Sequence, residues 1–147
     1  SNQLSHWTEA GILAGVPSDL NTIHTVPLWD DTSASLDDRA RGYLDINCAS
    51  CHGSAAGATN TSGLSLEYWR TFGREVGECK PPVAAGDGSG GLKYAIVPGN
   101  AAASILYFRM NSDEPEIRMP ESGRSVIHTE GVQLIADWID AMEPEPC

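Results

Sequence analysis

The residues whose types and spacing most directly imply chemistry are Cys48, Cys51 and His52, which stand in the order Cys-Ala-Ser-Cys-His. Two thiols at this spacing can form thioether bonds to the two vinyl groups along one edge of a porphyrin. The histidine that follows is then placed below the ring, where its imidazole can bind iron. The pattern therefore predicts a covalently attached haem c, with His52 as the proximal iron ligand.

Paired cysteines at this spacing also occur in zinc sites and in thioredoxin-like redox motifs. A closed zinc site needs four ligands, and the two remaining cysteines, Cys79 and Cys147, are single and far apart in the chain. A thioredoxin-like pair follows a buried strand and opens a helix, whereas here the pair closes a segment with helical periodicity. The sequence favours haem attachment over both alternatives.

The second axial position of the iron needs a ligand from elsewhere in the chain. Met119 is the preferred candidate, because it falls in a predicted loop that Pro120 stiffens, and a thioether ligand favours low-spin iron with a raised potential. Met110 and Met142 lie beside apolar residues at helical spacing and are more simply core residues. A distal site without a protein ligand remains an alternative. The other candidates are His6, His24 and His128.

Residues 35–47, directly before the cysteine pair, have the pattern of an α-helix. Ser35 is a suitable N-cap, and the acidic residues that follow it favour the positive end of a helix dipole. We expect Arg39 and Arg41 to lie outside the apolar face. That face is predicted to comprise Leu36, Ala40, Tyr43, Leu44 and Asn47.

The rest of the chain predicts short helices separated by long loops. No clear strand and no internal repeat is apparent, so the fold class predicted is all-α. The segments 53–63, 77–98 and 111–127 are rich in small or turn-forming residues and predict loops. Further helices are expected over 64–76, over 100–110 with Asn100 as its cap, and over 130–142 with Thr129 as its cap.

The domain organisation predicted is a strap over residues 1–34 and one helical domain over residues 35–147. The first part combines a short apolar-periodic piece with Pro17, Pro27 and several turn formers. We expect it to form a short helix and an extended strap that lies on the domain, anchored by Leu28 and Trp29.

Composition limits the classes of partner. A net charge of −11 opposes binding to nucleic acid or to an anionic membrane surface. No apolar run reaches the roughly 20 residues of a membrane span, so direct membrane insertion is not expected. The acidity predicts redox protein partners with a basic docking patch, although it can also serve solubility alone.

Cys79 and Cys147 remain once the haem cysteines are assigned. Haem attachment of this kind normally takes place outside the cytoplasm, so we expect a periplasmic or extracellular location. In an oxidising compartment two leftover cysteines suggest one disulfide, with two free thiols as the alternative. The disulfide would close a loop of about 69 residues and stabilise the fold by roughly 4 kcal/mol in the chain-entropy model.

The chain resembles a class I c-type cytochrome with a single haem. The likeness is carried by Ala40–His52, by Ile96–Asn100 with Ser104-Ile105-Leu106, and by Met119-Pro120 with the later Trp138-Ile139. The segments 79–86 and 118–125 are similar to those of haem domains in secreted or lipid-anchored bacterial multidomain proteins, most of them uncharacterised. The 78–98 excursion and the N-terminal strap are longer than in compact class I cytochromes.

The resemblance implies helices packed around one haem, thioether bonds at Cys48 and Cys51, His52 as proximal ligand and Met119 as distal ligand. We expect a loop group such as the Pro98 carbonyl to accept the proximal imidazole N–H. Side chains that could reach the haem propionates are Tyr68, Trp69, Arg74 and Tyr94.

The predicted function is one-electron transfer between extracytoplasmic redox partners, without catalysis, because no general-base constellation can be placed beside the haem. The chain can also be the haem domain of a larger oxidoreductase. The alternative from a different class is a haem enzyme, or a sensor of gas or peroxide, with a labile or open distal site; His128 and Arg124 are the residues nearest to that role.

Overall fold

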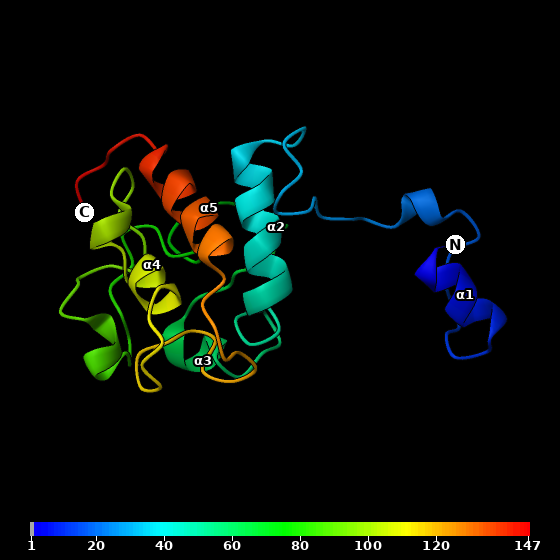
Figure 1. The fold of residues 1–147 in the computed structure, drawn as a ribbon, viewed down its shortest axis with the longest axis horizontal. Helices are drawn as coiled ribbons and strands as arrows, with labels where there is room; N and C mark the ends of the chain where they lie inside the picture. Colours follow the sequence, from blue (N-terminus) through cyan, green and yellow to red (C-terminus); the bar gives the residue numbers. More distant parts are fainter. Residues whose placement is uncertain (1) are drawn as a thin grey trace.

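Short helices joined by long irregular segments form the framework of the chain in the computed structural model, which describes residues 2–147 (Figure 1). Within those residues no strand forms, and only the isolated bridges Glu78–Ile96 and Tyr94–Ser104 occur. The predicted all-α class is confirmed. The α-helices are α1 (Gln3–Glu9), α2 (Leu36–Cys48), α3 (Thr59–Ser62), α4 (Ile105–Met110) and α5 (Thr129–Asp140), and the 3₁₀ turns are η1 (Leu20–Thr22), η2 (Gly86–Ser89) and η3 (Ala101–Ala103).

The core lies between α2 and α5, which run side by side in Figure 1. Leu44 of α2 and Ile135 and Ile139 of α5 have no accessible surface, and each such side chain stabilises the fold by roughly 1.5–3 kcal/mol. Close approach depends on Gly131, since a Cβ there would lie 2.4 Å from the Tyr43 hydroxyl. The two helices are thus held by apolar packing with little tolerance for added volume.

α2 begins and ends as its sequence predicts. The Ser35 hydroxyl accepts a hydrogen bond from the Asp38 N–H at 3.0 Å, which caps the helix, and the last helical residue is Cys48. Arg41, predicted to lie outside the apolar face, is absent from the apolar core but only 5% exposed. It donates to the backbone carbonyls of Tyr68 and Arg70, so it satisfies acceptors in a segment that wraps over the helix.

The helix predicted over residues 64–76 does not form. Phe72 still packs on the core, but Trp69 is 68% exposed. The backbone groups of this segment bond to distant side chains instead of to each other. The Tyr68 N–H donates to the Asp45 carboxylate at 3.0 Å, and the Tyr68 carbonyl, which a helix would use, accepts from Arg41. Tertiary partners therefore override the local apolar spacing.

The two later helices are shorter than predicted. Residues 100–110 divide into η3 and α4 at Ser104, because the first N–H groups of α4 donate to the Tyr94 and Ala95 carbonyls at 3.0 Å. Asn100 does cap this region, since its side chain accepts from the Ala103 N–H. α5 starts at Thr129 itself, so Thr129 is the first helical residue and not the predicted cap.

The N-terminal segment differs from the predicted strap over most of its length. α1 and η1 contain no buried residue and stand away from the helical body (Figure 1). Contact with the body is clear near Pro27, whose carbonyl would lie 3.0 Å from a Cβ at Gly42, and at Trp29, which packs on the core. Leu28, predicted as an anchor, is 66% exposed.

A disulfide between Cys79 and Cys147 joins the C-terminus to the segment before η2, with Cα atoms 5.2 Å apart. The Tyr94 hydroxyl adds a hydrogen bond to the Cys147 carbonyl at 2.7 Å. The expected disulfide is therefore present. None of the helices in the described residues is both long and apolar enough to cross a membrane.

Candidate functional site

The two cysteines of the Cys-x-x-Cys-His motif lie at the C-terminal end of α2. Cys48 is the last residue of the helix and packs against the core, whereas Cys51 is exposed, and both carry free thiols. The N–H groups of Cys51 and His52 donate to the Cys48 carbonyl at 3.0 and 2.7 Å, so one further turn follows the helix. This turn fixes both thiols and the imidazole on a short, rigid stretch of backbone.

The environment of Cys48 does not suit a redox dithiol. Burial, and then the charge of Cys51, raises the pKa of Cys48 to about 12, so this thiol stays neutral near pH 7. Attacking thiols of thioredoxin-like motifs have lowered pKa values and lie at helix N-termini, whereas this pair follows the negative end of a helix. The thioredoxin-like alternative loses support.

The imidazole of His52 has a defined hydrogen-bond partner, the Ser62 hydroxyl, 3.1 Å from Nδ1. The Ser62 hydroxyl donates its only proton to the Ala58 carbonyl at 2.8 Å and accepts from the Leu64 N–H at 3.1 Å. It can therefore only accept from His52, which places the imidazole proton on Nδ1. The lone pair of His52 is then on Nε2, the atom that would bind a metal.

Charge and burial favour the same neutral imidazole. Burial, and next the positive charge of Arg109, lowers the pKa of His52, and the charge of Glu121 opposes this effect. The expected partner of the imidazole, the Pro98 carbonyl, is not the group at Nδ1; a side-chain hydroxyl from α3 takes that place. Ser62 lies in the 53–63 segment, which was predicted to be a loop and contains the short helix α3.

α3 and the segment after it hold Ser62 in position. Gly63 has φ 66°, a left-handed value that ends the helix and is natural for glycine. Further along, the carboxylate of the buried Glu67 accepts from Ser54 at 2.8 Å, Ser65 at 2.9 Å and Arg70 at 3.0 Å. These hydrogen bonds, above all those from Ser54, lower the pKa of Glu67 to about 2. The ionised carboxylate thereby binds Ser54 and Ser65, which lie on either side of Ser62 in the chain.

Met119, the predicted distal ligand, lies half-buried in the loop between α4 and α5. Its N–H donates to the Arg109 carbonyl at 3.0 Å, which fixes the methionine next to the end of α4. Arg109, whose carbonyl accepts from the Met119 N–H, and Glu121, two residues after Met119, both act electrostatically on His52. The loop is therefore within electrostatic reach of the imidazole.

The other candidate ligands are engaged elsewhere. Met110 is 5% exposed, and both it and Met142 belong to the core, as predicted. The His128 imidazole lies 3.1 Å from the Tyr43 hydroxyl, and the His24 ring packs against Tyr68. His6 lies on α1, apart from the helical body.

The residues present fit a covalently bound haem. Two free thiols one turn apart, a neutral imidazole whose Nδ1 is already hydrogen-bonded, and a thioether on a fixed loop form the donor set that such a group requires. In addition, Nε of Arg118, next to Met119, is buried without any partner among the described residues.

A closed zinc site cannot recruit Cys79 and Cys147, because they form the disulfide. In residues 2–147 no three His, Cys, Asp or Glu side chains converge on one point.

All four side chains expected near the propionates have other partners or lie open to solvent. The Tyr68 hydroxyl donates to Asp38 at 2.8 Å, and the Tyr94 hydroxyl donates to the Cys147 carbonyl. Trp69 is exposed, and Arg74 is near the Cys79 carbonyl.

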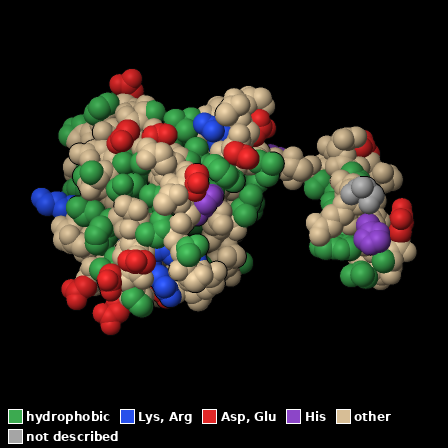
Figure 2. Space-filling model, in the orientation of Figure 1, with side chains coloured by type: hydrophobic (Ala, Val, Ile, Leu, Met, Phe, Trp, Pro, Cys, Tyr) green, Lys and Arg blue, Asp and Glu red, His purple; other side chains and the backbone are tan. Residues whose placement is uncertain are grey.

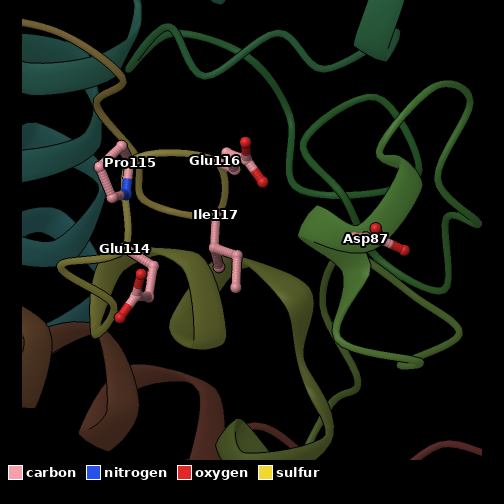
Figure 3. Close-up of a pocket in the computed structure, with 5 residues that line it drawn as sticks. All are labelled: Asp87, Glu114, Pro115, Glu116 and Ile117. Carbon is pink, nitrogen blue, oxygen red and sulfur yellow. The ribbon is translucent and has the colours of Figure 1, made fainter.

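A shallow pocket lies between η2 and the loop after α4 (Figure 3). Its wall carries the carboxylates of Asp87, Glu114 and Glu116, together with Pro115 and Ile117. None of the predicted site residues lines it, so the chemistry expected from the sequence is not located there.

Comparisons of the chain with protein-family models, with curated proteins and with solved structures find no match.

Proposed function

We propose that this chain is a monohaem electron-transfer domain with the class I cytochrome c fold, carrying one haem c at Cys48, Cys51 and His52. The observation that supports this most directly is the hydrogen bond between His52 Nδ1 and Ser62, because it leaves Nε2 free beside two unbridged thiols. A bound haem would supply an Fe(III)/Fe(II) couple that takes up and passes on one electron.

The residues of the chain have separate tasks in this proposal. Cys48 and Cys51 would hold the haem through two thioether bonds, each S–H adding across one vinyl double bond so that sulfur bonds to one carbon and hydrogen to the other. His52 is oriented by Ser62 and serves as the proximal ligand. Met119 serves as the distal ligand from a loop held by the Arg109 carbonyl, so both ligands are positioned before and after electron transfer and little reorganisation is needed.

Partners and location follow from charge and chemistry. A chain with a net charge of −11 is suited to a redox protein with a basic docking patch, and the association rate should fall as salt is raised. Covalent haem attachment and the Cys79–Cys147 disulfide both support a periplasmic or extracellular setting, alone or within a larger oxidoreductase.

The optical spectrum of the dithionite-reduced holoprotein, recorded with and without CO, tests the proposal. We expect a sharp low-spin c-type spectrum that CO leaves unchanged, because His52 and Met119 fill both axial positions. In Met119→Ala, we expect CO to bind and the reduction potential to fall. Met142→Leu, a change at a core methionine, is the matched control and should preserve the native spectrum. A native spectrum that shifts with CO would favour the enzyme or sensor instead.

A further inference from the structure

We propose that Arg109, Arg118 and Arg124 form the binding site for the carboxylates of the haem propionates. The inference rests on the proposed function, because it identifies the residues that hold the polar edge of the same haem. It also replaces the side chains expected from the sequence, such as Arg74, with a different group on the loop around Met119.

The three arginines concentrate positive charge in a chain that has little of it. They are three of only nine basic side chains, against 20 acidic ones. All three belong to α4 or to the loop that follows it. On the face shown in Figure 2, a group of Lys and Arg side chains lies in the region where Figure 1 places α3 and the loop before α5. The stretch 109–124 also carries four carboxylates, so the positive charge that suits an anionic ligand is confined to the guanidinium groups themselves.

Two of the arginines are fixed by backbone carbonyls. Nε of Arg109 donates to the Ile117 carbonyl at 2.7 Å, and Nη1 of Arg124 donates to the Met110 carbonyl at 2.8 Å. These contacts orient the guanidinium groups before any ligand binds and use only part of their donors, since each guanidinium has five N–H groups. Nη2 of Arg124 also donates to the Ser112 carbonyl, and the N–H groups that remain on both arginines can donate to a carboxylate.

Arg118 supplies the most specific observation. Its Nε is one of only three buried side-chain nitrogens that lack a partner in the part of the chain that the structure describes. A buried donor without an acceptor costs about 1–3 kcal/mol, so native proteins usually satisfy such groups with a partner or a ligand. An anionic acceptor next to Arg118 removes this cost.

The mutual repulsion of arginine side chains in this group also favours a bound anion. Burial, and then the positive charge of Arg118, lowers the pKa of Arg124, so the two guanidinium groups repel each other. The acidic neighbour of Arg109 is the exposed Glu121, whose Oε1 lies 4.0 Å from Nη2, at the outer limit of an ion pair. Two carboxylates placed among the arginines would offset this repulsion.

Position decides which carboxylates these are. Arg118 precedes Met119 in the chain, and the Arg109 carbonyl accepts from the Met119 N–H. The arginines therefore lie beside Met119, the proposed distal ligand, and the propionates of a haem bound there would supply the paired carboxylates.

The reduction potential of the haem-loaded protein tests the inference, with Arg118→Gln compared to Arg74→Gln. Both changes remove one positive charge, but Arg74 contacts the Cys79 carbonyl outside the arginine group. We expect Arg118→Gln to lower the potential, because an uncompensated propionate charge stabilises Fe(III). Arg74→Gln should leave the potential unchanged. Arg118→Lys keeps the positive charge but lacks the planar guanidinium that donates two parallel hydrogen bonds, so it should give an intermediate potential.

Equal potentials in Arg118→Gln and Arg74→Gln would overturn the inference. If Arg118→Gln does not fold, the same comparison is made with Arg124→Gln, which leaves Arg118 in place. Mass spectrometry of the native protein, expressed with a haem-attachment system, distinguishes a failure of the proposed function from a failure of the propionate site. An unmodified mass refutes the proposed function, whereas attached haem with an unresponsive potential refutes only the propionate site.

Discussion

The Ser62 hydroxyl has one proton and two lone pairs, and its neighbours use all three: the Ala58 carbonyl takes the proton, while the Leu64 N–H and His52 Nδ1–H donate to the oxygen. A hydrogen bond of this kind fixes the ring orientation and makes the imidazole a more electron-rich ligand. At the scale of single residues, Ser62 is thus a positioning residue for His52.

Replacement of Ser62 by Ala should raise the reduction potential of the holoprotein, because a less electron-rich imidazole stabilises Fe(III) less well. Thr61→Ala is the matched control: the Thr61 hydroxyl donates to the same Ala58 carbonyl at 3.0 Å but is exposed and does not contact His52. Ser62→Thr, which keeps the hydroxyl, should restore the native potential. Identical potentials in Ser62→Ala and Thr61→Ala would show that the hydroxyl does not act through His52.

At the scale of elements, α2 and α5 determine where the motif lies, since Cys48 is the last residue of α2. Beyond their apolar contact, one polar link connects the two helices: Nε1 of Trp138 donates to the Asp37 carboxylate at 2.7 Å. The Trp138 ring also meets Phe72 edge to face, with centroids 5.5 Å apart. This side chain thus joins α5 to α2 and to the segment that follows α3.

Trp138→Phe should lower the free energy of unfolding by about 1–3 kcal/mol, because it removes a hydrogen bond to a charged group and leaves space beside Phe72. Urea unfolding of the holoprotein measures the change. Trp69→Phe serves as the control and should alter stability by no more than about 0.5 kcal/mol, since that ring is mostly exposed. A similar loss in both variants would contradict the role assigned to Trp138.

At the scale of the whole molecule, the long irregular segments are held together by a covalent cross-link as well as by the packing of the short helices. The Cys79–Cys147 disulfide spans a sequence separation of 68 residues and joins the segment before η2 to the end of the chain. A covalent link over a loop of this length restricts the unfolded chain far more than the native one. It therefore stabilises the body that carries both proposed ligands.

The double change Cys79→Ser and Cys147→Ser should reduce the free energy of unfolding by roughly 4 kcal/mol in the chain-entropy model. Thiol-specific labelling before and after reduction confirms that the bridge is present in the native protein and missing in the variant. Tyr94→Phe, which removes only the hydrogen bond to the Cys147 carbonyl, is expected to cost about 1 kcal/mol or less. A double variant as stable as Tyr94→Phe would show that the bridge contributes little.

The sequence by itself determined the features that depend on local spacing. The N-cap at Ser35, the end of α2 at Cys48, the all-α class and the core roles of Met110 and Met142 all follow from capping chemistry and helical periodicity. The motif at Cys48, Cys51 and His52 belongs to the same category, because the chemistry it predicts needs only residues that are neighbours in the chain.

Only the tertiary structure decided which polar groups meet across long separations. The burial of Arg41 depends on carbonyls of a segment more than 20 residues later, the loss of the 64–76 helix depends on the same contacts, and the pairing of His52 with Ser62 depends on where α3 lies. Hydrogen bonds satisfy whichever donors and acceptors the fold brings together, and periodicity carries no information about that choice. The arginine group around Met119 was missed for the same reason, since its significance lies in a buried nitrogen without a partner.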